Sequence, residues 1–341
     1  MMGPAVGQPS CGSAMVDSYG PSKQPARKWG KMVPLDRAGA IKRPMLMGGL
    51  GVADAIARRY PAGRSPRPLS TPLYAIQPDR SSVHCPPMHD RSMITLHTAP
   101  SRWGLASVSP ACMELETWLR MAKLPYQTRL ATAEALAGAP YGKIPFIDYA
   151  GKRWGDTTLI IEMLGQAEGV DVDAGLSAAD RAIALAFRRM IKEHLYWGGI
   201  AIRYNVEENW QHYQKLVIGL LPPDTPPGET LAFADAFRQT IRNQMYQQGL
   251  GRLTDEALYQ TISADLQALS DFLGNQPFFM GDRPTTLDAT VYGHIGNFIQ
   301  PPYDHPIVEL ARQKTNLCDH YERMSHCFFG ELALDRAGEA V

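Results

Sequence analysis

The sequence predicts two structured domains, an α/β domain over residues 93–168 and an all-helical domain over residues 177–330. Three observations support this fold class. Short apolar segments alternate with amphipathic helix patterns after Met93, only helical spacing follows residue 177, and no sustained period of 3.6 or 2.0 residues precedes Met93. The 341 residues are enough for two domains that bury a substantial core.

The composition is that of an ordinary globular protein, with 45% hydrophobic and 20% charged residues. A formal net charge of +0 gives no reason to expect nucleic acid or an anionic membrane as a partner. No apolar stretch reaches the roughly 18 residues that a transmembrane segment needs. The five cysteines are irregularly spaced and odd in number, which fits a reducing compartment, so we expect a cytoplasmic protein.

The segment before the first domain, residues 1–92, differs from the rest of the chain. Residues 1–90 hold twelve Lys or Arg, five Asp, no Glu and 13 of the 27 prolines. This composition predicts a disordered N-terminal extension. Two other interpretations stay open: translation starts at Met88 or Met93, or the arginine-rich segment is a targeting peptide, although its prolines would break an amphipathic helix.

Four strands and two helices are expected in the α/β domain. Ser109 is a good N-cap, and Pro110 occupies the favoured first position of a helix. Asp156 or Thr157 caps the second helix. The strands are expected at residues 94–98, 126–131, 144–149 and 152–154.

The second domain shows helical spacing throughout. Thr285 and Asp288 form a capping box in which Asp replaces the usual Glu. Helices are expected over the apolar series 183–195, 234–245, 258–273, 291–298 and 307–321.

The order of elements in the first domain, with a proline leading the third strand, is the layout of a thioredoxin-like domain. Ser109 and Cys112 stand at the first and fourth positions of the tetrapeptide that opens its first helix, where thioredoxins carry two cysteines. A helix amino end carries unpaired N–H groups and stabilises a thiolate. With serine first, dithiol exchange is excluded, but the hydroxyl can donate to a bound thiolate; alternatively, Ser109 is only an N-cap.

The second candidate feature is the pair Ile144-Pro145. A proline at the start of a strand donates nothing to the sheet, and in this fold it is cis, so the preceding residue offers free backbone groups. Those groups can pair with an extended peptide. Ile144 is therefore a candidate for backbone contact with the cysteinyl part of glutathione; alternatively, Pro145 is an edge-strand proline without a ligand.

The third feature is Asp156-Thr157 at the start of the next helix. Helix amino ends bind carboxylates, and a hydroxyl beside an acid suits the α-carboxylate and α-ammonium of an amino acid. The γ-glutamyl end of glutathione carries both groups; alternatively, the pair is a plain helix cap. The three features occur in the expected order and at the expected separations.

With these three features, the chain resembles the cytosolic glutathione transferase superfamily over about residues 93–330. The resemblance to its failed-axon-connections and metaxin-like branch rests on Leu115–Arg120, Gly142–Ile147, Ile160–Glu162, His194–Trp197 and Glu208–Trp210, and Gly281–Asp288 resembles the capping box of transferases. It implies a thioredoxin-like N-terminal domain and an all-α, glutathione-transferase-type C-terminal domain with a ligand cleft between them.

The resemblance implies a transferase that binds glutathione as co-substrate and directs its thiol at a small electrophile or into thiol exchange. Ser109 would be catalytic, with Ser107 as runner-up and Ser101 a weaker competitor, while Ile144, Pro145, Asp156 and Thr157 would bind glutathione. The alternative is a non-catalytic, metaxin-like adaptor whose cleft is filled by Trp103 or Tyr141. A homodimer is possible, and no nucleic acid is expected.

Two further groups of side chains stand out. Aromatic residues and an arginine in the helical domain either line a second-substrate pocket or belong to the core; they are Tyr196, Trp197, Arg203, Tyr204 and Trp210. The spacing of Cys318, His320, His326 and Cys327 matches no standard zinc pattern, so no metal is predicted.

Overall fold

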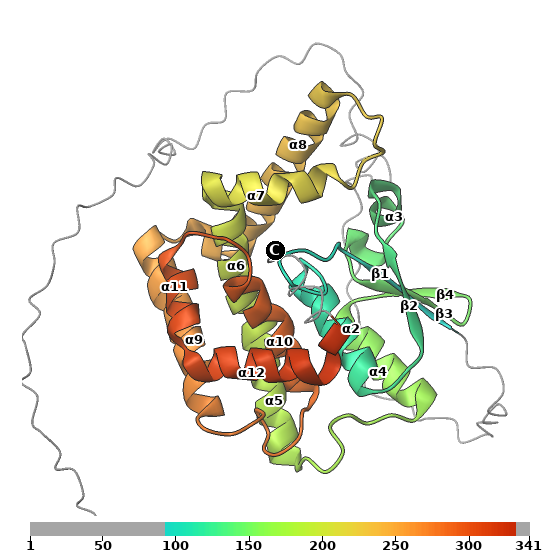
Figure 1. Cartoon of the computed structure of the whole chain (residues 1–341), viewed down its shortest axis with the longest axis vertical. Helices are drawn as coiled ribbons and strands as arrows, with labels where there is room; N and C mark the ends of the chain where they lie inside the picture. The colour runs from blue at the N-terminus through green and yellow to red at the C-terminus, as the bar shows by residue number, and fades with distance from the viewer. Residues whose placement is uncertain (1–92, 332–341) are drawn as a thin grey trace, which may run out of the picture. The chain divides into compact units, whose positions relative to one another are not determined.

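A computed structural model of the chain describes residues 93–331, and the predicted N-terminal extension lies outside the described residues. The first domain contains a four-stranded sheet and three α-helices (Figure 1). Its elements are β1 (Ile94–Thr98), α2 (Pro110–Met121), β2 (Tyr126–Leu130), α3 (Ala133–Ala137), β3 (Phe146–Tyr149), β4 (Lys152–Gly155) and α4 (Thr157–Glu168).

The sheet has the strand order β2-β1-β3-β4. β1 pairs with β2 in parallel, whereas β3 lies antiparallel to both β1 and β4. The peptide bond between Ile144 and Pro145 is cis, as the thioredoxin-like layout implies. This topology confirms the predicted fold class for the first domain.

The second domain is helical throughout the described residues. Its elements are α5 (Ala178–Met190), the π-helical turn Ile191–Leu195, α6 (Tyr196–Asn205), α7 (Glu207–Ile218), α8 (Pro227–Gln248), α9 (Asp255–Leu273), α10 (Thr286–Ile299), α11 (Pro306–Gln313) and α12 (Thr315–Phe328). The change from mixed to all-helical structure falls between the end of α4 and the start of α5.

Two details of the helix prediction were wrong. The single helix expected over residues 307–321 is two helices, because Lys314 leaves helical geometry with ψ at 82°. The sequence reasoning also missed α3, α6 and α7. α3 has only five residues and none is buried, so it leaves no apolar pattern to detect.

The two domains meet where α10 crosses α2. α10 is buried along nearly its whole length, and Gly293 makes the close approach possible. A Cβ atom at Gly293 would lie 2.5 Å from the carbonyl oxygen of Pro110 and 2.9 Å from the nitrogen of Glu114. The first turns of α2 therefore lie directly against the helical domain.

The capping box at the start of α10 forms as predicted. The carboxylate of Asp288 accepts hydrogen bonds from the backbone N–H of Thr285 at 2.8 Å and from its hydroxyl at 2.9 Å. It also accepts from the N–H of Phe279 and contacts Nε2 of His320, both at 2.9 Å. Asp288 thus anchors α10 to the preceding loop and to α12.

Candidate functional site

The amino end of α2 is capped by Ser109, as predicted. Its hydroxyl accepts a hydrogen bond of 3.4 Å from the backbone N–H of Cys112, and the side chain is half-buried. Pro110 follows at the first helical position. The helix therefore presents a capped, partly open amino end where an anion would be stabilised.

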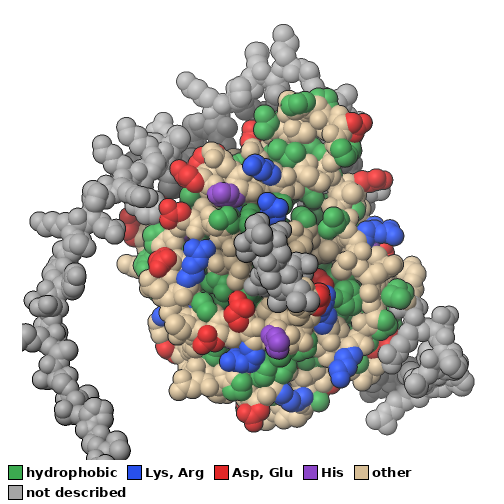
Figure 2. Space-filling model, viewed as in Figure 1, with side chains coloured by type: hydrophobic (Ala, Val, Ile, Leu, Met, Phe, Trp, Pro, Cys, Tyr) green, Lys and Arg blue, Asp and Glu red, His purple; other side chains and the backbone are tan. Residues whose placement is uncertain are grey.

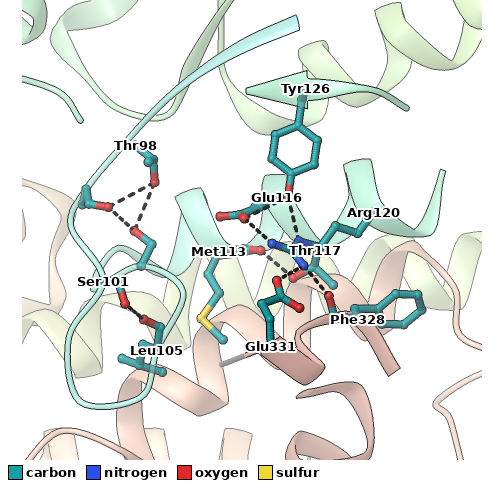
Figure 3. Close-up of polar contacts among 12 residues, drawn as sticks. Thr98, Ser101, Leu105, Met113, Glu116, Thr117, Arg120, Tyr126, Phe328 and Glu331 are labelled. Carbon is teal, nitrogen blue, oxygen red and sulfur yellow. Dashed lines mark hydrogen bonds and ion pairs between the residues drawn. The ribbon is translucent and has the colours of Figure 1, made fainter. Parts of the chain in front are cut away.

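The two serines that compete with Ser109 for the catalytic role use their hydroxyl hydrogens within the protein, and Figure 3 labels the first of them, Ser101. Ser101 donates to the carbonyl of Leu105 at 2.7 Å. Ser107 is fully buried, donates to the carbonyl of Ala99 at 3.2 Å and accepts from the hydroxyl of Thr98. Ser109 accepts from the N–H of Cys112 and its side chain also interacts with the Cys112 thiol, but it is half-buried whereas Ser107 is fully buried, and this exposure favours Ser109 over Ser107 as a donor to a ligand.

Cys112 is fully buried beneath the first turn of α2. Burial raises the pKa of its thiol, and hydrogen bonds from Ser109 and neighbouring groups offset this only in part. A buried thiol that keeps its proton is a poor nucleophile. The structure therefore gives Cys112 a packing role and offers no exposed cysteine for glutathionylation at this position.

Ile144 lies beside the start of α2. Its side chain packs against the small cluster of Ala99, Val108 and Cys112. Among the described residues, neither its N–H nor its C=O takes part in a hydrogen bond. Pro145 is buried and leads into β3, so Ile144 keeps its backbone groups available for an extended ligand.

Asp156 is the N-cap of α4, and its backbone is strained. One carboxylate oxygen accepts from the N–H groups of Thr158 at 2.9 Å and Leu159 at 3.1 Å. Its φ of 69° and ψ of 120° lie outside the regions that L-residues prefer, although the side chain is exposed. Strain of this kind at an exposed residue is typical of ligand sites, because the fold must hold it in place.

Thr157 is buried, and its hydroxyl faces away from solvent. It donates to Glu114 on α2 at 3.0 Å and accepts from Lys192, whose ammonium also lies 3.0 Å from the hydroxyl of Thr158. A hydroxyl engaged in this way is not free for a ligand carboxylate. The backbone N–H of Thr157 is the group that this residue can offer.

Glu114 is the centre of a buried charge cluster that the sequence reasoning missed. It is fully buried and lies 3.4 Å from Lys192 and 3.8 Å from Arg188, and it also accepts from Thr290 at 2.8 Å. Burial raises the pKa of Glu114. The nearby Lys192, His294 and Arg188 together lower this pKa by more than burial raises it, so it lies below the usual value. The neighbouring sequence does not indicate that Glu114 is a buried ion, because its cationic partners lie more than 70 positions away in the chain.

Arg203 on α6 reaches across to the loop before Ser109. Its Nη1 donates to the carbonyl of Val108 at 3.2 Å and its Nη2 to Oδ1 of Asn297 at 3.0 Å. The side chain is only 5% exposed. Arg203 also lines a small cavity of about 10 Å³ beside Pro110, Tyr196 and Asn297.

The other aromatic candidates divide between the site and the core. Tyr196 lines the same small cavity as Arg203 and is half-buried. Tyr204 and Trp210 are buried and belong to the core of the helical domain, against which Trp197 packs. Of the five residues that the sequence suggested for a second-substrate pocket, only Tyr196 and Arg203 line the cavity.

Trp103 lies close to the same face of the molecule. It packs against the cluster around Cys112 and contacts Tyr303 edge-on at 5.8 Å between ring centroids. Tyr141, in contrast, is 73% exposed and fills no cleft. Of these two side chains, only Trp103 packs against the cluster that lies beneath the start of α2.

The far end of α2 holds a second polar cluster (Figure 3). Arg120 donates to Glu116 at 3.1 Å, to the hydroxyl of Tyr126 at 2.7 Å and to the carbonyl of Phe328 at 2.7 Å, and it pairs with Glu331. This cluster fastens the end of α12 to the helix that carries Ser109.

The described residues contain no group of three His, Cys, Asp or Glu side chains arranged to hold a metal ion. No helix within residues 93–331 combines the length and the apolar character that crossing a membrane requires. On the face shown in Figure 2, basic and acidic side chains are interspersed. That face presents no single-sign patch.

Family models match both halves of the described chain. The model for the glutathione S-transferase N-terminal domain matches residues 110–209, and the model for the glutathione S-transferase C-terminal domain matches residues 262–324.

Relatives of known name point in the same direction. The chain is 34% identical over 239 residues to isoprene-epoxide–glutathione S-transferase of Rhodococcus sp. (strain AD45), covering 68% of this chain and 98% of that protein. It is 27% identical to failed axon connections of Drosophila melanogaster, covering 76% of this chain and 64% of that protein. It is 24% identical to human metaxin-2, covering 66% and 84% respectively. The chain therefore belongs to the glutathione S-transferase superfamily, in the branch that includes failed axon connections and the metaxins.

Proposed function

We propose that this protein is a glutathione transferase that binds glutathione across the amino ends of α2 and α4. The strained Asp156 is the observation that carries the proposal, because an exposed acid held at this φ at the amino end of α4 suits an α-ammonium group. Ile144 would pair with the cysteinyl backbone. The N–H of Thr157 would bind the γ-glutamyl carboxylate, and Pro145 would hold Ile144 in position.

Ser109 would donate its hydroxyl hydrogen to the glutathione sulfur. The amino end of α2 adds the favourable dipole, so the bound thiol loses its proton to solvent more readily than free glutathione does. The protein supplies orientation and electrostatic stabilisation for the attack.

We propose an epoxide as the electrophile to test first, since the relative with 34% identity is named for one. The thiolate sulfur forms a bond to a ring carbon, the carbon–oxygen bond breaks, and the oxygen takes up a proton from solvent. This addition needs no metal ion, oxidant or reductant to balance its atoms and electrons. A cytoplasmic location, where glutathione is abundant, is part of the proposal.

One observation favours the alternative function, a non-catalytic adaptor. Trp103 packs against the cluster around Cys112, and the cavity beside Pro110 has a volume of only about 10 Å³, room for no more than about one water molecule. An adaptor tolerates such a closed site, whereas a transferase needs glutathione to lie along the open surface of Ile144 and Asp156.

Calorimetric titration of glutathione into the full-length protein and its Asp156→Asn variant tests the proposal. Asparagine keeps an oxygen that caps α4 and tolerates positive φ, so the variant removes the charge and spares the cap. Losing one charge-assisted hydrogen bond should weaken binding about 10- to 100-fold.

The matched control is Asp180→Asn, which alters an acid in the capping box of α5. It should bind glutathione as the unaltered protein does. Absence of measurable binding by the folded, unaltered protein would contradict the transferase proposal and favour the adaptor.

A further inference from the structure

Arg203 is a buried cation without an anionic partner in the described part of the chain. Its two terminal nitrogens bond to a carbonyl and an amide oxygen, and its Nε, although buried, has no hydrogen-bond partner. No ion pair joins it to a carboxylate of residues 93–331. Burying a charge without a partner of opposite charge is strongly unfavourable. An anionic ligand bound near Arg203 would offset this cost.

The groups that face Arg203 supply no negative charge. Its guanidinium carbon lies 4.4 Å from the ring centroid of Tyr213 and 5.9 Å from that of Tyr303. Burial raises the pKa of Tyr196 to about 12 and raises the pKa of Tyr204 and Tyr303 as well, so these phenols keep their protons at neutral pH. The buried thiol of Cys112 also stays protonated.

The acids and the histidine on the neighbouring helices do not compensate either. Glu114 on α2 is already matched by Lys192 and Arg188, and Glu116 is paired with Arg120. Burial lowers the pKa of His294 on α10, which leaves that ring neutral at pH 7. The positive charge of Arg203 therefore acts on its surroundings without local cancellation.

The location of this charge indicates which anion it serves. Arg203 holds the carbonyl of Val108, the residue directly before Ser109, and it lines the cavity beside Pro110. The amino end of α2 contributes a second positive potential at the same place. Both act on the point where the proposed function places the glutathione sulfur.

We propose that Arg203 is the counter-charge that stabilises a glutathione thiolate at the amino end of α2. The inference rests on the proposed function and assigns to it a positioning residue from the helical domain. Arg203 acts in two ways: its positive charge stabilises the thiolate electrostatically, and its hydrogen bond to the carbonyl of Val108 holds the residue before Ser109 in place. The proton lost by the thiol passes to solvent, and no other bond changes.

The test is the apparent pKa of the bound glutathione thiol, followed by the ultraviolet absorbance of the thiolate as pH is raised. At an effective dielectric of about 20, a unit charge within roughly 10 Å shifts a pKa by about one unit or somewhat more. Arg203→Gln should therefore raise the pKa of the bound thiol by about one unit. Arg203→Lys keeps the charge and should largely preserve the value.

Arg238→Gln is the matched control. Arg238 lies on α8, packs over Trp210 and is paired with Glu207, so its charge is cancelled locally. Removing it should leave the thiol pKa unchanged. A general loss of packing from removing a buried arginine would not produce a selective shift in one titration.

A second variant keeps the arginine and cancels its charge, which covers the case in which Arg203→Gln does not fold. Asn297→Asp places a carboxylate next to Nη2 and should raise the thiol pKa as Arg203→Gln does. An unchanged thiol pKa in a folded variant that still binds glutathione would overturn this inference alone. No glutathione binding by the unaltered protein would overturn both proposals.

Discussion

Glu114 is expected to hold the two domains together, and replacing it with glutamine tests this. Glutamine has the same size, but its single carbonyl oxygen can accept from only one of the two hydroxyls of Thr157 and Thr290, so the variant removes the charge and one accepted hydrogen bond. Coulomb's law at an effective dielectric of about 20 gives roughly 5 kcal/mol for a pair 3.4 Å apart, the separation between Lys192 and Glu114. Desolvation and the repulsion between the two cations reduce this figure.

Leaving two cations beside a neutral side chain should lower the free energy of unfolding by about 3–5 kcal/mol. For a protein of this size, that change corresponds to a fall in Tm of about 6–20 °C. Urea unfolding, followed by tryptophan fluorescence, measures it. Glu162→Gln, the same change at an exposed position of α4, should shift stability by less than about 0.5 kcal/mol.

The stabilisation by Glu114 should depend on pH in a defined direction. Its pKa is lowered in the folded state from 4.5, so its contribution is fully present above that value and is lost as pH falls through the lower, folded value. The stability difference between the unaltered protein and Glu114→Gln should therefore shrink in acid. A difference below about 1 kcal/mol at neutral pH would refute the argument that this charge cluster holds the interface.

Three further predictions concern the same framework. Gly293→Ala should destabilise the protein by about 2–4 kcal/mol, because the new Cβ would press against the backbone of α2, while Gly228→Ala, which meets open space, should change thermal stability little; equal melting temperatures for the two variants would contradict the close approach. Asp288→Ala leaves four buried donors unpaired and should cost about 4 kcal/mol or more in urea unfolding; a cost under 1 kcal/mol would count against its anchoring role. Arg120→Met should release the end of α12 and cost about 1–3 kcal/mol, with faster amide exchange at Phe328 than at the far end of that helix; unchanged exchange would show that Arg120 does not fasten it.

The strands and the helix starts could be predicted from the sequence because their signals are local. Apolar alternation marks β1, and Ser109 followed by Pro110 marks the start of α2. The capping box at Thr285 is likewise a four-residue pattern. Each of these features depends on residues that are neighbours in sequence, so a short segment of the chain is enough to identify it.

The polar core between the domains could not be predicted in this way. The sequence of α2 does not distinguish Glu114 from an exposed acid; the approach of α5, its π-helical turn and α10 makes it a buried ion. The same approach turns the hydroxyl of Thr157 inward, where the sequence suggested that it faces a ligand. Arg203 was recognised as a possible pocket residue, but that no carboxylate of residues 93–331 pairs with it is a property of the packed structure.

The structure of the full-length protein in complex with glutathione tests the central claim most directly. We predict the sulfur within hydrogen-bond distance of the Ser109 hydroxyl, the cysteinyl backbone paired with Ile144, and the γ-glutamyl carboxylate at the N–H of Thr157 with its ammonium at Asp156. Glutathione bound elsewhere on the protein, or a site at α2 that stays closed by Trp103 at saturating glutathione, would contradict the account.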